Sequence, residues 1–170
     1  RSSTTAATEG RGSRSSCTRL GLESAAAAVA LLEDFRAGGR LAMFEVMPAI
    51  GYRAVVDNFD TVRDPFGEKH PWYLLCDWEV DTEEDGLAIA ENTIGKALEN
   101  NKIKDAVIAV NQTQAADILS IREHMSAGQK FLGGSVKHDI TVPIDKIPEF
   151  FNRADAAMES IVPGCRPVGF

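Results

Sequence analysis

Cysteine, histidine and long apolar runs are all scarce in this sequence. The 170 residues include three cysteines, Cys17, Cys76 and Cys165, whose wide spacing fits neither a metal clip nor a disulfide framework. This usage is typical of a reducing compartment. The longest apolar stretch, SAAAAVALL, is much shorter than the roughly 20 residues needed to span a bilayer. The sequence therefore predicts no transmembrane segment.

Basic charge is also in short supply. Lys and Arg total 18 against 25 Asp and Glu, which gives a net charge of -7 and a pI of about 5.0. Nucleic-acid binding requires clustered Lys and Arg, so this balance argues against a nucleic-acid partner. Hydrophobic residues make up 44% of the chain, and a chain of this length can bury a sizeable core. The composition indicates a globular domain of ordinary size.

The N-terminus differs in composition from the rest of the chain. Residues 1–18 are rich in Ser, Thr, Arg and Gly and have no hydrophobic period. We expect this segment to be disordered or non-native, and we expect the folded domain to cover residues 19–170.

Regular apolar patterns begin near Leu22 and alternate between the helix period and the strand period. The predicted helices cover residues 24–36, 48–59, 81–101, 113–130 and 145–161. The predicted strands cover residues 41–47, 72–80, 105–110, 135–142 and 165–170. The predicted N-caps are Ser24, Asp81 or Thr82, Asn111 or Thr113, and Asp145.

This order of elements allows either a parallel α/β sheet or an α+β sandwich. Strands 72–80 and 135–142 carry polar residues on one parity, as in a sheet with one face turned away from the helices. The sequence therefore favours an α+β fold, in which helices pack on one face of an antiparallel sheet.

Several catalytic and cofactor signatures are absent from the sequence. There is no Gly-x-Gly-x-x-Gly, no phosphate loop and no Gly-x-Ser-x-Gly. The three histidines, His70, His124 and His138, have no metal-ligand spacing. His138 shares a parity with Val136 and Ile140, so we expect it to be a packed core histidine, whereas His124 is expected at the surface.

One group of polar side chains does suggest a site. Arg122 and Ser126 are four residues apart on a predicted helix, so they share one face of it. Lys137 follows on the polar parity of the next predicted strand, so all three can converge on one anion. A guanidinium suits a carboxylate because it can donate two parallel hydrogen bonds. The alternative is that Arg122 pairs with Asp117 or Glu123 at the surface and that Lys137 is solvated.

Longer segments resemble a known family. The stretch ADILSIREHMSAGQKFLGGSVKHDITVPIDKIPEFFNRADAAMESIVPGCRPVGF resembles the C-terminal domain of FAD-linked oxidases of the vanillyl-alcohol-oxidase type, through its IRE helix, SVKHDITVP strand and IPEF helix start. GLESAAAAVALL, MFEVMP and VRDPFGEKHPWYLL are also similar to this family. The likeness is strongest to the D-2-hydroxyacid dehydrogenase branch, which includes D-lactate dehydrogenases, D-2-hydroxyglutarate dehydrogenase and the glycolate oxidase D subunit. It runs from about residue 20 to the end and implies part of a ferredoxin-like domain.

The resemblance also implies roles for the polar group. In these dehydrogenases the Arg of the IRE helix, a hydroxyl one turn later and the Lys of the strand hold the substrate carboxylate. The residues in those positions are Arg122, Ser126 and Lys137. Leu119 stands where the family usually has Trp. No catalytic residue is expected within this sequence.

Two cofactors are implied by the same resemblance. FAD is held mainly by an N-terminal domain without a counterpart in this sequence. A divalent metal is held by a His-x-Gly-Asp-Gly-Asn-x-His motif, which is expected after Phe170. The family's first strand is expected before GLES, where GRGSRSSC stands instead, so we expect the sheet to lack an edge strand.

The implied function is part of a flavin-dependent dehydrogenase that oxidises a D-2-hydroxy acid to the 2-oxo acid, with this part binding the substrate carboxylate. The α-hydrogen would leave as hydride to the flavin, and a metal-assisted base would take the hydroxyl proton. The isolated chain is expected to be inactive. Expected partners are a small 2-hydroxy acid, an electron acceptor and a second copy in a homodimer, in the bacterial cytoplasm or the mitochondrial matrix. The alternative is a stand-alone, non-catalytic α+β module that binds an anion or a protein partner.

Overall fold

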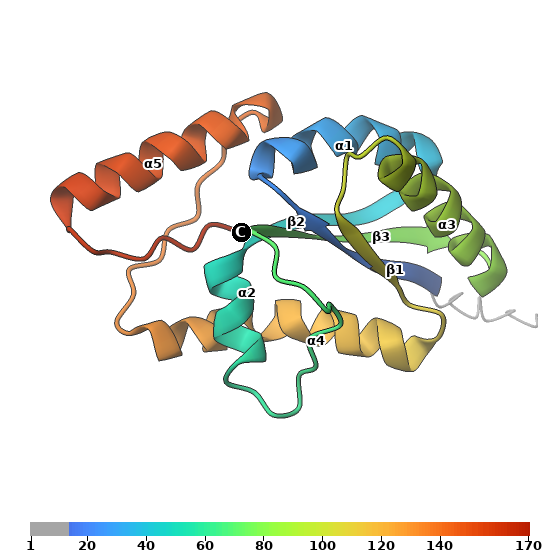
Figure 1. Ribbon diagram of the computed structural model, residues 1–170, viewed down its shortest axis with the longest axis horizontal. Helices are drawn as coiled ribbons and strands as arrows, with labels where there is room; N and C mark the ends of the chain where they lie inside the picture. The colour runs from blue at the N-terminus through green and yellow to red at the C-terminus, as the bar shows by residue number, and fades with distance from the viewer. Residues whose placement is uncertain (1–13) are drawn as a thin grey trace, which may run out of the picture.

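The architecture is an antiparallel sheet between two layers of helices. The computed structural model describes residues 14–170. The strands β1 (Arg14–Leu22), β2 (Leu41–Pro48), β3 (Trp72–Val80) and β4 (Asp105–Ile108) pair in the order β2-β3-β1-β4 (Figure 1). Each neighbouring pair is antiparallel. The α+β class and the antiparallel sheet are confirmed, and the succession of strands and helices is that of a ferredoxin-like βαββαβ unit with an extra helix after β2.

The helices form largely where the sequence predicts them. They are α1 (Ala25–Gly38), α2 (Ala49–Val56), α3 (Glu83–Glu99), α4 (Gln112–Gly128) and α5 (Ile147–Ile161). Three of the predicted N-caps are confirmed, because the side chains of Ser24, Thr82 and Asn111 each accept a hydrogen bond from a backbone N–H three residues later. Such caps satisfy donors that the helix itself leaves unpaired.

Helices cover both faces of the sheet, not one face as the sequence suggested (Figure 1). The core layer between the sheet and helices α1 and α3 includes Leu20, Leu31, Phe35, Leu74, Trp78 and Ile94. The layer between the sheet and helices α2 and α4 includes Cys17, Met47, Tyr52, Tyr73, Leu75, Ile118 and Ile121. The prediction failed because Asp77 and Glu79 made one face of β3 look solvent-exposed. Tyr73 and Leu75 lie on the same face of the strand and are fully buried.

Strand β1 lies in the middle of the sheet, between β3 and β4. It begins at Arg14, so residues 14–18 belong to the folded domain, and the expected loss of an edge strand is wrong. Residues 1–13 lie outside the described residues. The strand was hard to find in the sequence because its buried positions mix Cys17 and Leu20 with a hydroxyl, Thr18, and a guanidinium, Arg19.

The predicted strand at 135–142 is not part of the sheet. This segment follows a turn at Gly133, whose φ of 113° suits glycine, and within residues 14–170 it pairs with no strand. Val136 is 84% exposed and Ile140 is 61% exposed. His138 is exposed as well, so the expected core histidine is not found. The alternating pattern was present, but alternation alone does not supply a neighbouring strand to pair with.

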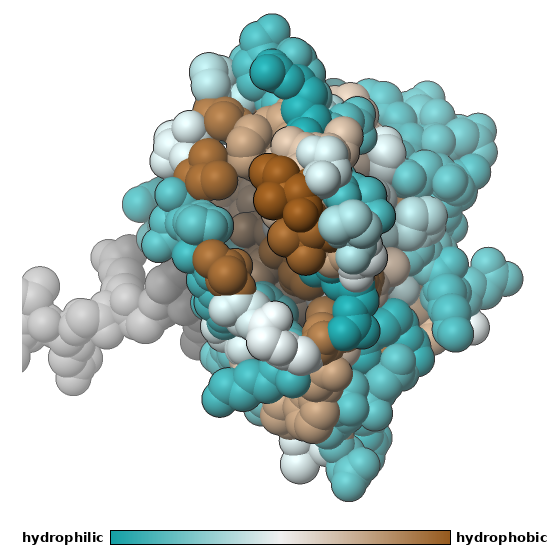
Figure 2. Space-filling model, turned by 90° about the vertical axis from the view of Figure 1, so that its left-hand side faces the viewer, coloured by the Kyte–Doolittle hydropathy of each residue, from teal (hydrophilic) through white to brown (hydrophobic). Residues whose placement is uncertain are grey.

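Helix α5 rests on the rest of the domain through few contacts. Phe151 packs against Trp72 with ring centroids 5.3 Å apart, yet no residue of the helix is fully buried. The helix follows a 3-10 turn at Ile144–Lys146, so Asp145 is not its N-cap. Figure 2 shows apolar side chains gathered on this side of the molecule. The predicted strand at 165–170 is irregular, and none of the helices described between residues 14 and 170 is long and apolar enough to cross a membrane.

Candidate anion site on helix α4

Helix α4 presents two of the predicted site residues on its solvent side. Its buried residues include Ile118, Ile121 and Met125, which face the sheet and α2. Arg122 and Ser126 are exposed and four residues apart, so their side chains are neighbours on one face of the helix. The helix itself is thus the scaffold that places a guanidinium one turn before a hydroxyl.

Lys137 reaches the same helix from the segment that follows it. Its Nζ donates to Ser126 Oγ at 2.7 Å and lies 3.4 Å from the Ser126 carbonyl oxygen. The reversal after α4 at Gly133 brings the chain back far enough for this contact. The structure therefore brings Ser126 and Lys137 together, although Lys137 lies on an irregular segment and not on a strand.

Arg122 has a partner that the sequence analysis missed. Its Nε donates to Glu45 Oε2 at 2.8 Å and its Nη2 donates to Glu45 Oε1 at 3.1 Å. The pairing with Asp117 or Glu123 considered from the sequence is not the one formed. Hydrogen bonds to Glu45, followed by its negative charge, raise the pKa of Arg122. Arg122 is therefore a fixed cation with a defined orientation.

The position of Glu45 could have been recognised from its strand. Glu45 lies opposite Leu75 in the β2–β3 register, so it is on the face covered by α2 and α4. The next residues on its parity, Met43 and Met47, pack against that core layer. A carboxylate among apolar side chains on an inward parity is a signal that a cation lies nearby.

The charges and donors of this group suit a single carboxylate. A guanidinium has five N–H donors, of which Glu45 takes two, so three remain on Arg122. Lys137 keeps further ammonium donors, and the Ser126 hydroxyl can still donate after accepting from Lys137. Two cations and one carboxylate leave a net charge of +1. The group can bind and orient an anion by charge-assisted hydrogen bonds.

A buried arginine fixes α4 against the sheet. Arg19 on β1 is fully buried, and its Nη2 donates to the carbonyl oxygen of Ile118 on α4. Its guanidinium lies 5.4 Å from the centre of the Tyr52 ring on α2. Burial lowers the pKa of Arg19. The contact ties the central strand to the helix turn that precedes Arg122, which helps to hold the candidate site in place.

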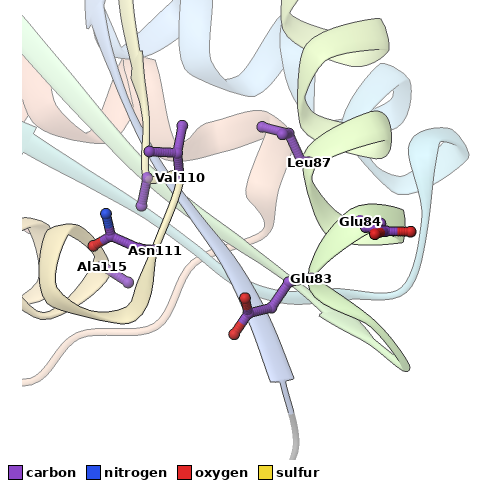
Figure 3. A pocket seen from close by; sticks show the side chains of 7 residues that line it. Glu83, Glu84, Leu87, Val110, Asn111 and Ala115 are labelled. Atoms are coloured by element: carbon purple, nitrogen blue, oxygen red, sulfur yellow. The ribbon is translucent and has the colours of Figure 1, made fainter.

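Two hollows of the described surface do not fit a flavin. One, of about 200 Å³, lies between the starts of α3 and α4, and its lining includes Glu83, Glu84, Val110 and Asn111 (Figure 3). Its two carboxylates disfavour the diphosphate of FAD. Another, of about 270 Å³, lies between α1 and α3 and is also small. Neither includes Arg122, Ser126 or Lys137.

Metal ligands are not grouped in the described part of the chain. Between residues 14 and 170, no three His, Cys, Asp or Glu side chains lie close enough together to hold a metal ion. His124, which was expected at the surface, is half-buried beside Phe59, with ring centroids 4.7 Å apart. Its Nδ1 lies 2.6 Å from the Ser120 carbonyl oxygen, so this ring has a structural partner.

Comparison with known families identifies the domain. The family described as FAD linked oxidases, C-terminal domain, matches residues 14–166. The chain therefore belongs to this family. The match begins at Arg14, the first residue of β1, which agrees with the central place of this strand in the fold.

Individual relatives are plant dehydrogenases. The chain is 27% identical over 115 residues to the mitochondrial D-2-hydroxyglutarate dehydrogenase of Arabidopsis thaliana, a match that covers 68% of this chain and 21% of that protein. It is 25% identical over 111 residues to a probable mitochondrial D-2-hydroxyglutarate dehydrogenase of Oryza sativa subsp. indica, covering 65% of this chain and 20% of that protein. The matched segment is thus about a fifth of the length of these relatives.

Proposed function

We propose that this chain supplies the substrate-carboxylate site of a flavin-dependent dehydrogenase that oxidises a D-2-hydroxy acid to the 2-oxo acid. Arg122, Ser126 and Lys137 bind the carboxylate and orient the substrate. The membership in the FAD linked oxidase family and the likeness to D-2-hydroxyglutarate dehydrogenases support the class of enzyme and of substrate. D-Lactate and D-2-hydroxyglutarate are the substrates to compare.

The observation that carries the proposal is the contact between Lys137 and Ser126. Lys137 Nζ lies 2.7 Å from Ser126 Oγ, and Arg122 is one helix turn away on the same face. The Ser126 hydroxyl accepts from Lys137 at an exposed position, where a polar contact of this kind contributes little to stability. It has a purpose as a donor to an anion that the two cations attract.

We expect this chain to position the substrate, while the flavin and the metal carry out the chemistry. FAD, which the family implies, would accept the hydride of the substrate, and the resemblance to this family implies that another domain holds it. A divalent metal near the hydroxyl group of the substrate remains part of the proposal for the whole enzyme. The three residues of this chain contribute position, since holding the carboxylate fixes the rest of a small substrate.

The test is a titration of the 170-residue chain followed by two-dimensional NMR. D-Lactate should move the amide signals of α4 and of residues 133–143 in a saturable way. Lys137→Met should weaken this binding about tenfold, the loss of one charge-assisted hydrogen bond. Lys96→Met is the matched control, because Lys96 lies on α3, on the other face of the sheet, and its loss changes the net charge equally.

Two results would contradict the proposal in different ways. Equal losses from Lys137→Met and Lys96→Met would mean that only net charge matters and that no site exists on α4. Acetate binding as tightly as D-lactate would favour the alternative, an anion-binding module with no preference for hydroxy acids. Arg122→Lys, which keeps the charge and loses the planar fork, should weaken D-lactate binding several-fold.

A further inference from the structure

We propose that Glu45 is the positioning residue of the carboxylate site: it holds Arg122 side-on, so that the remaining edge of the guanidinium is presented to the substrate. This inference rests on the proposed function. It adds a residue from β2, 77 positions away from Arg122, to a site that otherwise belongs to α4 and the segment after it.

The geometry defines which donors are left for a ligand. Glu45 accepts from Nε and from one hydrogen of Nη2, which together form the side edge of the guanidinium. The end edge, with one N–H on each Nη atom, remains and can donate two parallel bonds to a second carboxylate. Arg122 thus bridges a resident carboxylate and an incoming one.

Glu45 lowers the entropy cost of ordering the Arg122 side chain when an anion binds. A free arginine side chain on a helix surface samples many rotamers and must be ordered when it binds an anion. The side chain of Glu45 is only 30% exposed, and its strand is paired with β3, so it is a firm anchor for Arg122. The guanidinium is already oriented before a ligand arrives, which strengthens binding of a planar partner.

A second ion pair in the same chain shows what an ordinary surface contact looks like. Arg153 and Glu149 are four residues apart on α5, make a single contact of 3.4 Å, and are 79% and 58% exposed. The Arg122–Glu45 pair differs in each respect, since it joins two elements, has two hydrogen bonds of 2.8 and 3.1 Å, and is less exposed. The Arg153–Glu149 pair therefore serves as the control for the role proposed for Glu45.

The experiment separates orientation from charge by comparing a planar anion with a spherical one. The full chain is titrated with D-lactate and with bromide, and the ratio of their affinities is measured for the wild type, Glu45→Asp and Glu45→Gln. Glu45→Asp keeps the negative charge but shortens the side chain, so the carboxylate lies farther from Arg122. The affinity for bromide should therefore stay constant. The preference for D-lactate should fall about fivefold, because the orientation of a charge-assisted hydrogen-bond pair is lost.

Glu45→Gln removes the negative charge, so it should raise bromide affinity and still lower the preference for D-lactate. Glu149→Gln on α5 should leave the ratio unchanged. If both Glu45 variants keep the wild-type ratio while the wild type binds D-lactate, Glu45 has no positioning role and the carboxylate site stands without it. If the wild type shows no saturable D-lactate binding, the proposed function fails, and this inference fails with it.

Discussion

The imidazole of His70 packs directly on the backbone of Gly21. A Cβ at position 21 would lie 2.4 Å from Cδ2 of the His70 ring, which is closer than any real contact of this kind. His70 is 7% exposed, and its Nε2 lies 3.7 Å from Asp105 Oδ2 on β4. The loop between α2 and β3 therefore packs on the central strand β1 at Gly21. Glycine is required there because any side chain would occupy the space of the His70 ring.

Gly21→Ala should therefore destabilise the fold by about 1–3 kcal/mol, the range for overpacking a filled interior. The free energy of unfolding, measured with urea, is the test. Gly67→Ala is the matched control in the same loop, because a Cβ there meets nothing within 4 Å. A loss at Gly21 no larger than the loss at Gly67 would mean that the His70 contact does not restrict this position.

The Arg122–Glu45 pair should contribute little to stability. Both side chains are partly exposed, at 47% and 30%, and pairs of this kind couple by less than about 1 kcal/mol. A double-mutant cycle with Arg122→Ala and Glu45→Ala measures this coupling in urea unfolding. A coupling of several kcal/mol would contradict this expectation and would show that the pair also stabilises the fold.

The cysteines should differ sharply in reactivity. Burial raises the pKa of Cys17 to about 12, and burial also raises the pKa of Cys76, so neither thiol forms the reactive thiolate near neutral pH. Cys165 is partly exposed. An aromatic disulfide reagent should react with one thiol per native chain and with three after denaturation. A second fast thiol in the native protein would contradict the burial of β1 or β3.

Stability should fall in alkaline solution. Burial raises the folded-state pKa values of Cys17, Cys76, Tyr52 and Tyr73 above their ordinary values of 9.0 for the thiols and 10.0 for the phenols. The unfolded chain loses these protons first, so the contribution of the four groups is complete below pH 9.0 and is lost as the pH rises further. Urea midpoints should drop between about pH 9 and about pH 11. A constant midpoint over this range would refute the prediction.

The helices could be predicted from the sequence because their signals are local. Ser24, Thr82 and Asn111 cap their helices through residues three positions away. The sheet was harder, since the buried Arg19 breaks the apolar pattern of β1 and finds its partner, Ile118, 99 residues later. In segment 135–142 polar and apolar residues do alternate, but the segment is irregular. Whether such a segment joins a sheet depends on residues far away in the sequence.

The candidate site divides in the same way. Arg122 and Ser126 could be placed together by helical spacing alone. Their approach to Lys137 was expected on a strand and occurs on an irregular segment. Glu45 was missed because nothing near Arg122 in the sequence indicates a strand 77 residues earlier. Local periodicity predicts which residues share a surface, whereas the partner that orients them is set by the topology.

The central place of β1 has a consequence for how the domain assembles. Thr18 pairs with Cys76 on one side and with Ile108 on the other, so the earliest of the described strands has both neighbours far downstream. During synthesis the middle of the sheet leaves the ribosome before either flank exists, and it must wait for two long loops to close. A hairpin-like pairing of β2 with β3 can form earlier, and the sheet is then completed by insertion of β1. Refolding of this small domain is therefore expected to be slow for its size, with a phase in which the β1 edge of β3 is open to a second chain.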